Sequence, residues 1–374
     1  MKFIAAMVMM LGLILTAPLA WAADPVKIGV MAPVTGQWAS EGQDMVNIVK
    51  LLAEEVNKNG GAGGHMIEIE VGDDGGDPKV ASLAAQRLIS SGVVAVIGTY
   101  GSAITEATQD IYADDDILQI GTGSTSIRLT EKGLPLFFRT CPRDDDQGKV
   151  MAREVAALGF KKAAILHDNS SYAKGLADEV RGIIKDSGVE EVFFDALTPG
   201  DRDYTTTLTK IKTKNPDVII FTGYYPEAGM ILRQKKEMGW DVAMIGGDAT
   251  NNSALVDIAG NASAEGYYFI SPPGPSDLTD PMSQAFLAEF RSRYNTEPSS
   301  VWSMMAGDAF KVLVAAVENV DKVSAESLAE YLHNDLKDFV GFTGPIAFNA
   351  KGDRVGDVYR LYQVDGEGRF VLGQ

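Results

Sequence analysis

Short apolar stretches rich in β-branched residues alternate with amphipathic stretches along most of the chain. The apolar stretches predict strands at residues 26–31, 66–71, 93–98 and 117–120 in the first half, and at 162–167, 189–194, 217–222 and 243–245 in the second. The amphipathic stretches predict helices at 42–57, 80–90, 104–112, 147–158, 175–186, 205–214 and 228–238. Strands that recur roughly every 25–30 residues with a helix between them are typical of βαβ units. The pattern predicts an α/β protein with two mostly parallel sheets.

The two halves of the chain carry matching sequences where their third and fourth strands end. Residues 97–102 read Ile-Gly-Thr-Tyr-Gly-Ser, and residues 221–225 read Phe-Thr-Gly-Tyr-Tyr. Residues 120–124 read Ile-Gly-Thr-Gly-Ser, and residues 245–248 read Ile-Gly-Gly-Asp. Ligands of open α/β sheets bind at the carboxyl ends of the strands, beside helix N-termini. Two such sets of loops that face each other predict a ligand cleft.

The first residues have the pattern of a secretory signal peptide. Lys2 precedes an apolar run at residues 3–16, and Ala20 and Ala22 fit the small-x-small rule for cleavage. The run is shorter than the ~20 residues that a membrane-spanning helix needs. We therefore expect residues 1–22 to be removed after Ala22. The mature protein would then be periplasmic, with no membrane insertion.

Charge and cysteine content exclude several classes of function. The 33 Lys and Arg residues stand against 51 Asp and Glu residues, for a net charge of -18. An acidic surface repels phosphate, so we expect no nucleic-acid partner. The single cysteine, Cys141, can form neither an internal disulfide nor a multi-thiolate metal site, and we expect it to be a buried apolar residue. The three histidines are far apart in sequence, so we expect no metal and no cofactor.

Several ordered phrases give the chain a family resemblance. It resembles the leucine/isoleucine/valine-binding proteins, which are type I periplasmic solute-binding proteins of ABC transporters, over essentially the whole mature chain. The phrases are Gly-Asp-Asp-Gly-Gly-Asp-Pro at 72–78, Asp-Ile-Tyr at 110–112, Phe-Arg-Thr at 138–140 with Asp-Gln-Gly at 146–148, His-Asp at 167–168 with Tyr172, Gly-Tyr-Tyr-Pro-Glu at 223–227 with Ile-Leu-Arg-Gln at 231–234, and Val-Trp at 301–302.

The resemblance implies two doubly wound, Rossmann-like lobes joined by three crossover segments, with the ligand cleft between them. The crossovers would fall near Arg143, Ile270 and Tyr359. Lobe 1 would comprise residues 23–143 and 271–358, and lobe 2 residues 144–270 and 359–374. Residues 280–332 would supply two helices that return to lobe 1, and residues 342–349 and 358–364 would form the closing strands.

The resemblance also implies where an amino acid would bind. The Ser102 hydroxyl and N–H, together with the Thr125 N–H, match the family's carboxylate clamp, and Ser102 opens a predicted helix. The Gly123 carbonyl and the Thr125 hydroxyl match the acceptors for the ammonium group. Asp248 stands where the family has an acidic residue that pairs with the ammonium group. Tyr224 would approach the same group through its ring, as a cation–π contact, or through its hydroxyl.

The side-chain pocket departs from the family pattern. Tyr100 and Tyr172 match pocket-lining positions, and Ser124 lies in the same loop as Gly123. Glu41 stands where an aromatic residue is common, and Trp38, one helical turn earlier, could replace the lost ring. Because Ser300 also replaces a bulky aromatic residue, the pocket could be that of a leucine binder or a roomier and more polar one.

The expected function is the capture of a free branched-chain or aliphatic amino acid, by a monomer that closes its lobes and delivers the ligand to an ABC import permease. A ligand-sensing receptor module for amino acids or amides is the alternative. A secreted hydrolase is less well supported, because Ser171-x-x-Lys174 fits S-x-x-K without its partner motifs. Residues 73–77 resemble a calcium loop but lack its last glutamate. The acidic run at residues 144–146 is expected to be a solvated crossover and helix cap.

Overall fold

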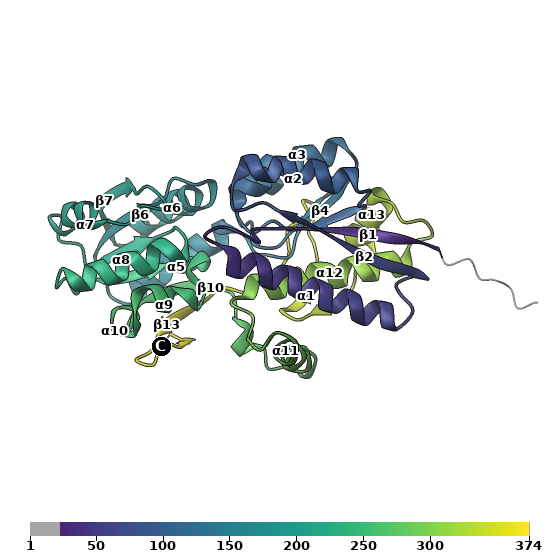
Figure 1. The fold of residues 1–374 in the computed structure, drawn as a ribbon. Helices are drawn as coiled ribbons and strands as arrows, with labels where there is room; N and C mark the ends of the chain where they lie inside the picture. The colour runs from purple at the N-terminus through teal and green to yellow at the C-terminus, as the bar shows by residue number, and fades with distance from the viewer. Residues whose placement is uncertain (1–22, 374) are drawn as a thin grey trace, which may run out of the picture.

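The computed structural model describes residues 23–373. The expected signal peptide and its cleavage site lie outside these residues. Two α/β bodies stand side by side, and the chain passes between them more than once (Figure 1). Within residues 23–373, no helix has both the length and the apolar character that a membrane span requires. We use lobe 1 for the first sheet with its helices and lobe 2 for the second sheet with its helices.

Lobe 1 is built on a parallel sheet with the strand order β2-β1-β3-β4-β5. Its strands are β1 (Ala23–Ala32), β2 (His65–Asp73), β3 (Ala95–Ile97), β4 (Leu118–Gly121) and β5 (Phe137–Arg139). The first helices are α1 (Ala39–Lys58), α2 (Pro78–Ser90), α3 (Ser102–Asp114) and α4 (Arg128–Glu131). Val26, Ile28 and Val30 of β1 are buried, as are all residues of β3 and β4, because helices cover both faces of the sheet.

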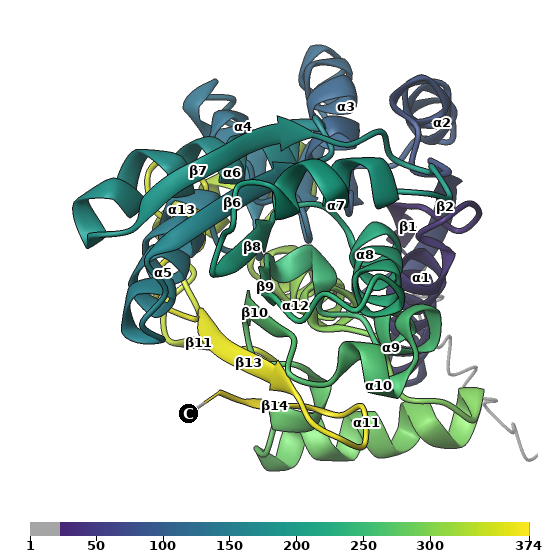
Figure 2. The ribbon, with the colours of Figure 1, turned by 90° about the vertical axis from the view of Figure 1, so that its left-hand side faces the viewer.

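Lobe 2 has a longer sheet, with the order β14-β13-β10-β9-β8-β6-β7. Its strands are β6 (Lys162–His167), β7 (Glu190–Ala196), β8 (Val218–Phe221), β9 (Ala243–Gly246), β10 (Tyr268–Ser271), β13 (Arg360–Val364) and β14 (Phe370–Leu372). The helices of this part of the chain are α5 (Asp144–Ala157), α6 (Ser171–Ile184), α7 (Thr205–Lys212), α8 (Tyr225–Glu237), α9 (Ala254–Ala259) and α10 (Asn261–Ala264). Strands β13 and β14 join antiparallel at one edge, which Figure 2 shows in yellow.

The sequence pattern found the repeated strands and helices within a few residues of their ends. It missed four short strands, β5, β10, β11 (Phe339–Gly341) and β14. The expectation of two helices over residues 280–332 is wrong, because three form: α11 (Pro281–Tyr294), α12 (Val301–Asn319) and α13 (Ala325–Asn334). Asn295 ends α11 in a left-handed conformation, and the Ser300 and Ser324 hydroxyls cap the next two helices.

One of the two expected closing strands differs from the expectation, whereas the other, at residues 358–364, is found as β13. Within residues 342–349 only the short strand β12 (Gly344–Ile346) forms. It pairs antiparallel with β11 (Phe339–Gly341) in a short hairpin. Helix α12 packs against α1 and α13 packs near β4, so this part of the chain returns to lobe 1 before β13 pairs with β10. This path agrees with a lobe made of separate segments. The residue limits given above for the lobes stay a prediction.

Candidate functional site

Four aromatic rings meet where the strand ends of the two lobes face each other. Trp38 and Tyr100 come from lobe 1, Tyr172 and Tyr224 from lobe 2, and all four side chains are buried. The Trp38 and Tyr224 ring centroids are 4.3 Å apart, and that of Tyr100 lies 5.5 Å from Trp38 and 5.8 Å from Tyr224. Tyr172 contacts Tyr224 at 5.3 Å. The structure therefore brings these four predicted residues together across the two lobes.

Ser102 and Thr125 form a polar corner of lobe 1 beside these rings. Ser102 is the first residue of α3, where backbone N–H groups have no partner within the helix. Its hydroxyl accepts a hydrogen bond of 3.2 Å from the Ser126 N–H, which ties the helix start to the loop after β4. The Thr125 hydroxyl is buried and has no hydrogen-bond partner among residues 23–373. Free donors at a helix N-terminus favour an anionic group.

The Ser124 side chain points into lobe 1, away from the proposed ligand position. Its hydroxyl lies 2.6 Å from the Thr105 hydroxyl and donates to the Thr99 carbonyl at 3.0 Å, inside lobe 1. The side chain therefore braces the loop against α3, and only the main chain of Ser124 remains a candidate for ligand contact. The neighbouring Gly123 donates its N–H to the same Thr99 carbonyl at 3.3 Å. Both residues fix the loop that carries Thr125.

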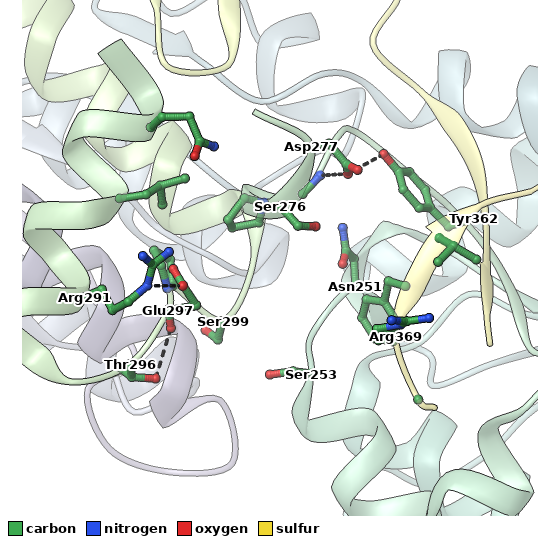
Figure 3. A pocket seen from close by; sticks show the side chains of 18 residues that line it. Asn251, Ser253, Ser276, Asp277, Arg291, Thr296, Glu297, Ser299, Tyr362 and Arg369 are labelled. Carbon is green, nitrogen blue, oxygen red and sulfur yellow. Dashed lines mark hydrogen bonds and ion pairs between the residues drawn. The ribbon is translucent and has the colours of Figure 1, made fainter. Parts of the chain in front are cut away.

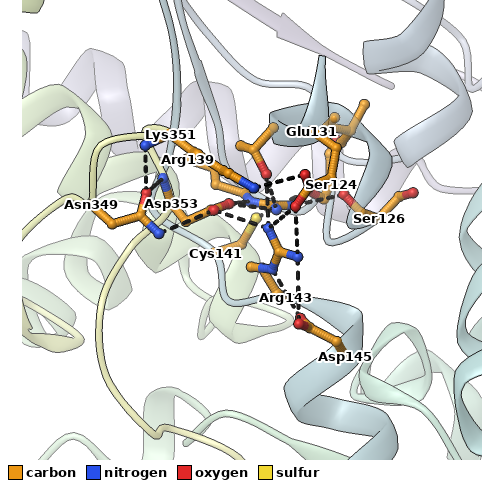
Figure 4. A network of polar contacts seen from close by, with 12 residues as sticks. Ser124, Ser126, Glu131, Arg139, Cys141, Arg143, Asp145, Asn349, Lys351 and Asp353 are labelled. Carbon is orange, nitrogen blue, oxygen red and sulfur yellow. Dashed lines mark hydrogen bonds and ion pairs between the residues drawn. The ribbon is translucent and has the colours of Figure 1, made fainter. Parts of the chain in front are cut away.

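A buried ion-pair network holds this loop from the other side (Figure 4). Arg139 of β5 donates to the carbonyls of Ser124 and Ser126 at 3.1 and 2.8 Å. Its charge is balanced by Asp353, which also pairs with Arg143 at 3.0 Å. The two arginines hold the pKa of Asp353 below its usual value, against the effect of burial. The loop around Thr125 is thus fixed to the chain at residues 139–143 and at residue 353.

Asp248 is held firmly within lobe 2. It follows β9, is buried, and accepts hydrogen bonds from the Tyr172 hydroxyl at 2.8 Å and from the Tyr359 hydroxyl at 2.9 Å. Its N–H donates to the Gln147 side chain at 3.3 Å. Burial raises the pKa of Asp248 to about 7, although these hydrogen bonds oppose the shift. Gln147 and Tyr359 are partners that the sequence reasoning did not identify.

Asp144 corrects the expectation that the acidic run is solvated. Asp145 pairs with Arg143 and Asp146 pairs with Lys149, whereas the side chain of Asp144 is buried. Neither of its carboxylate oxygens has a hydrogen-bond partner among residues 23–373. Burial raises the pKa of Asp144 and the nearby charge of Asp248 raises it further, whereas the adjacent Thr125 hydroxyl and the charge of Arg139 oppose the shift.

Asp144 also lies close to Thr125, because its N–H donates to the Thr125 carbonyl at 3.0 Å. The position of this carboxylate could have been suspected from the helix pattern. Successive residues at a helix start point about 100° apart, so three consecutive acidic residues cannot all face solvent at a junction between lobes. The sequence carried no signal that says which of the three is buried.

Glu41 is buried at the start of α1, one turn after Trp38. Its carboxylate accepts hydrogen bonds from the Ser300 hydroxyl and, at 2.7 Å, from the Asn252 amide of lobe 2. Burial raises the pKa of Glu41 to about 7, and the two hydrogen bonds oppose the shift. Glu41 and Ser300 are the two positions at which the sequence departs from the aromatic residues of the family pattern. The two departures are linked, because the Ser300 hydroxyl donates a hydrogen bond to the Glu41 carboxylate.

Two cavities open near the junction of the lobes. One of about 620 Å³ is lined from lobe 1 by Glu106, Ser126 and Arg128, and it reaches Asp144 and Ser171. There the Ser171 hydroxyl donates to Glu106 at 2.7 Å and accepts from Arg128 at 2.7 Å, so the two lobes are in contact.

The other cavity, of about 800 Å³, lies between α11 and the edge of lobe 2 and is lined by none of the predicted site residues (Figure 3). Asp277 and Tyr362 are joined there at 2.8 Å. Across residues 23–373, no three His, Cys, Asp or Glu side chains are grouped so as to hold a metal ion. The Ser102, Thr125, Asp144 and Asp248 groups combine a helix N-terminus with buried carboxylates, which is chemistry that suits a ligand site.

Known proteins similar to this chain are binding proteins for small molecules. Residues 25–369 match the family described as periplasmic binding protein. A leucine-, isoleucine-, valine-, threonine- and alanine-binding protein of Pseudomonas aeruginosa is 34% identical over 91% of this chain and 90% of its own length. A Leu/Ile/Val-binding protein of Rhizobium johnstonii is 33% identical over 93% of each chain.

Solved structures give the same result. The branched-chain amino acid transporter substrate binding protein of Streptococcus pneumoniae, in complex with isoleucine, has a TM-score of 0.84 and 31% identity over 92% of this chain and 97% of its own. A leucine binding protein of Thermotoga maritima has a TM-score of 0.85 and 27% identity over 93% and 98% of the two chains. The chain therefore belongs to the leucine/isoleucine/valine-binding family of periplasmic binding proteins.

Proposed function

We propose that the protein captures a free aliphatic α-amino acid between its lobes and delivers it to an ABC import permease. The observation that carries the proposal is the meeting of two opposite kinds of polar group. The N-terminus of α3 at Ser102 suits an anion, and the buried carboxylates of Asp144 and Asp248 suit a cation. An α-amino acid carries both charges on one carbon atom.

The ligand carboxylate would bind at the N-terminus of α3. The N–H groups of Ser102 and Ala103, which precede the first hydrogen bonds of the helix, and the Thr125 N–H would donate to it, and the Ser102 hydroxyl is placed to add a further hydrogen bond. The helix dipole adds a favourable interaction with the negative charge. The bracing of this loop by Arg139 and Ser124 would keep these donors in place before the ligand arrives.

The ligand ammonium group would bind on the opposite side, between Asp144 and Asp248. Asp144 has two carboxylate oxygens available, and the Thr125 hydroxyl can accept a further hydrogen bond. Burial makes ionisation of both carboxylates costly in the free protein, and a cation between them would offset that cost. Tyr224 would close over the same group from lobe 2.

Closure of the lobes would follow from these contacts. Ser102 and Thr125 belong to lobe 1, Asp248 and Tyr224 to lobe 2, so only the closed form offers every contact at once. Direct contacts between lobes would support this form. The Tyr225 hydroxyl of α8 donates to the Gln37 carbonyl at 2.8 Å, near the start of α1.

The relatives support transport over catalysis. Their names describe binding proteins for leucine, isoleucine and valine, and one solved structure holds isoleucine. Ser171, the serine of the S-x-x-K match, is hydrogen-bonded to Glu106 and Arg128, and Lys174 pairs with Asp178, so the serine and the lysine of the match are not hydrogen-bonded to each other. We infer that the mature protein works in the periplasm, after removal of residues 1–22, as a monomer.

Isothermal titration calorimetry tests the proposal directly. The protein should first be unfolded and refolded, so that carried-over ligand is removed. At least one common aliphatic amino acid should bind with 1:1 stoichiometry, and no heat with any common amino acid would contradict the proposal. Loss of amino-acid uptake in cells that lack the gene would then separate transport from a sensing role, which predicts the same binding but unchanged uptake.

A further inference from the structure

Three buried side chains from separate elements form a hydrogen-bonded group around the Asp248 carboxylate. Tyr172 lies in the first turn of α6, Tyr359 directly precedes β13, and Gln147 lies in the first turn of α5. The two tyrosines each donate to a different oxygen of Asp248, at 2.8 and 2.9 Å. Gln147 in turn donates to the Tyr359 hydroxyl at 3.0 Å. A Cβ at Gly247 would lie 2.5 Å from the Tyr172 hydroxyl and 2.8 Å from the Gln147 amide oxygen, so glycine leaves the space for this group.

The main chain fixes the direction of the hydrogen bonds between Gln147, Tyr359 and Asp248. The Asp248 N–H can only donate, and it faces the Gln147 side chain at 3.3 Å, so the oxygen of the Gln147 amide is the atom that accepts. The NH2 group of Gln147 then faces Tyr359 and can only donate to its oxygen. The single hydrogen of the Tyr359 hydroxyl is therefore left for Asp248.

The same reasoning applies to Tyr172 on the other oxygen of Asp248. The Ala249 N–H donates to the Tyr172 oxygen at 3.4 Å, which leaves the hydroxyl hydrogen for Asp248. Both carboxylate oxygens thus accept from a tyrosine, as those of an ionised aspartate do. A proton on the oxygen that faces Tyr359 would deprive the Tyr359 hydrogen of its acceptor, which is unfavourable for a buried donor. The arrangement favours the charged form of Asp248.

Tyr359 and Gln147 both lie close to segments that join the lobes. Arg354 donates to the Thr140 carbonyl after β5 of lobe 1 at 3.2 Å, and five residues later Tyr359 leads into β13 of lobe 2. Gln147 follows the start of α5, on the chain that runs from β5 to lobe 2. Groups beside connecting segments move least when two lobes open, so Asp248 should keep these partners in the open form.

We propose that Tyr359, oriented by Gln147, is a positioning residue for recognition of the ligand ammonium group. Its hydroxyl keeps Asp248 as a carboxylate and holds it in place. A carboxylate offers about four positions for hydrogen bonds, and the two tyrosines take two of them, so the others are available to the ligand. The inference rests on the proposed function, since it assumes that the ammonium group binds between Asp144 and Asp248.

Tyr359→Phe tests the role of the hydroxyl, because it keeps the ring. Calorimetry on refolded protein would compare the common aliphatic amino acid that the wild type binds most tightly with the α-hydroxy acid of the same carbon skeleton. Affinity for the amino acid should fall about 3- to 10-fold, the size of a single hydrogen bond. Affinity for the hydroxy acid should change less than about twofold, because that ligand brings no cation to Asp248. A residue that only maintains the fold would lower both affinities alike.

Tyr362→Phe is the matched control. Tyr362 lies three residues further along the chain in β13, and its hydroxyl donates to Asp277 at 2.8 Å, beside the cavity between α11 and lobe 2 (Figure 3). This variant loses the same atom from the same type of pair, and it should bind both ligands as the wild type does.

A double variant shows whether Tyr359 acts through Asp248. In the Asp248→Asn background, Tyr359→Phe should lower the affinity for the amino acid less than about twofold, because the carboxylate that Tyr359 positions is already lost. If Tyr359→Phe does not fold, Gln147→Met removes the group that orients the Tyr359 hydroxyl. It should lower the affinity for the amino acid more than that for the hydroxy acid.

The outcomes separate the inference from the proposed function. An unchanged affinity of Tyr359→Phe for the amino acid, an equal loss for both ligands, or a full additional loss in the double variant overturns the inference and leaves the proposed function standing. A folded wild-type protein that binds no amino acid overturns the proposed function and this inference with it.

Discussion

Lobe 1 and lobe 2 bring their polar groups to the cleft in different states. In lobe 2 the Asp248 carboxylate is already hydrogen-bonded to Tyr172 and Tyr359. The Thr125 hydroxyl of lobe 1 and the carboxylate of Asp144, the first residue of α5, lie beside each other at the junction, and neither has a hydrogen-bond partner among residues 23–373. Buried polar groups are normally hydrogen-bonded, so those that are not carry the strongest indication of a ligand. The comparison assigns Asp144 the larger share of ammonium binding and Asp248 a supporting share.

The largest expected effect is that of Asp144→Asn. If the ammonium group pairs chiefly with Asp144, removing one partner of a buried ion pair should cost about 3–5 kcal/mol of binding free energy, roughly a 150- to 4,000-fold loss of affinity. Calorimetry measures this loss directly. Asp146→Asn is the matched control, because Asp146 lies two residues away and is paired at the surface with Lys149. Equal affinity of Asp144→Asn and the wild type would remove Asp144 from the site.

A smaller loss is expected for Asp248→Asn, about 1.5–3 kcal/mol of binding free energy, the range for a hydrogen bond to a charged group. The Tyr172 and Tyr359 hydroxyls can keep hydrogen bonds to the asparagine, so lobe 2 should stay folded. Thermal unfolding of the free variant checks that point. A loss greater than that of Asp144→Asn would reverse the order that the comparison assigns.

The effect of pH on binding should be smaller still: over one pH unit, affinity should change less than it does in Asp248→Asn. The pKa of free Asp248 is raised to about 7, and a bound ammonium group would lower it. Binding then releases a proton below pH 7, so affinity should fall as the pH falls from 7 to 5, by at most about tenfold per unit for each proton. Titrations at several pH values measure the slope. Asp248→Asn should reduce the slope to the part that comes from Asp144, whose pKa burial also raises, and a slope that is unchanged in this variant would exclude Asp248 as a source.

The last expected effect concerns the stability of the free protein and leaves ligand affinity aside. The pKa of Glu41 is raised to about 7 in the folded state, so the folded protein holds a proton there that the unfolded chain releases above about pH 4.5. The Glu41 contribution to stability is therefore largest at low pH and declines as the pH rises from 4.5 to 7. Glu41→Gln should lose this part of the pH dependence, on the order of 1–3 kcal/mol across the interval. Urea unfolding at pH 5 and pH 7 gives the difference between the two proteins, and identical pH dependence would contradict it.

The sequence predicted the fold well because its strands and helices repeat regularly. The glycine-rich strand ends also placed Ser102, Thr125 and Asp248 at the edges of the sheets that face each other, since a strand end followed by a helix has a fixed place in this architecture, while their roles in ligand binding stay a prediction. Contacts between residues far apart in the chain could not be predicted in this way. Tyr359 approaches Asp248 across a separation of 111 residues, and Asn252 reaches Glu41 across 211.

Side-chain direction was the other limit. Ser124 and Thr125 are neighbours of similar chemistry, yet one hydroxyl turns into α3 and the other stays without a partner. The Arg139 donations that set the loop come from a strand too short for its pattern to be recognised. A local sequence pattern cannot distinguish such neighbours, because packing against the rest of the lobe decides which way each of them points.

The central claim is that both charges of an α-amino acid are recognised, with the ammonium group between Asp144 and Asp248. Calorimetric comparison of an amino acid that binds, such as alanine, with the α-hydroxy acid of the same carbon skeleton tests it most directly. The hydroxy acid keeps the carboxylate and loses the ammonium group. We expect its affinity to be lower by at least about 100-fold, in line with the loss of a buried ion pair. Equal affinity of the two compounds would contradict the account.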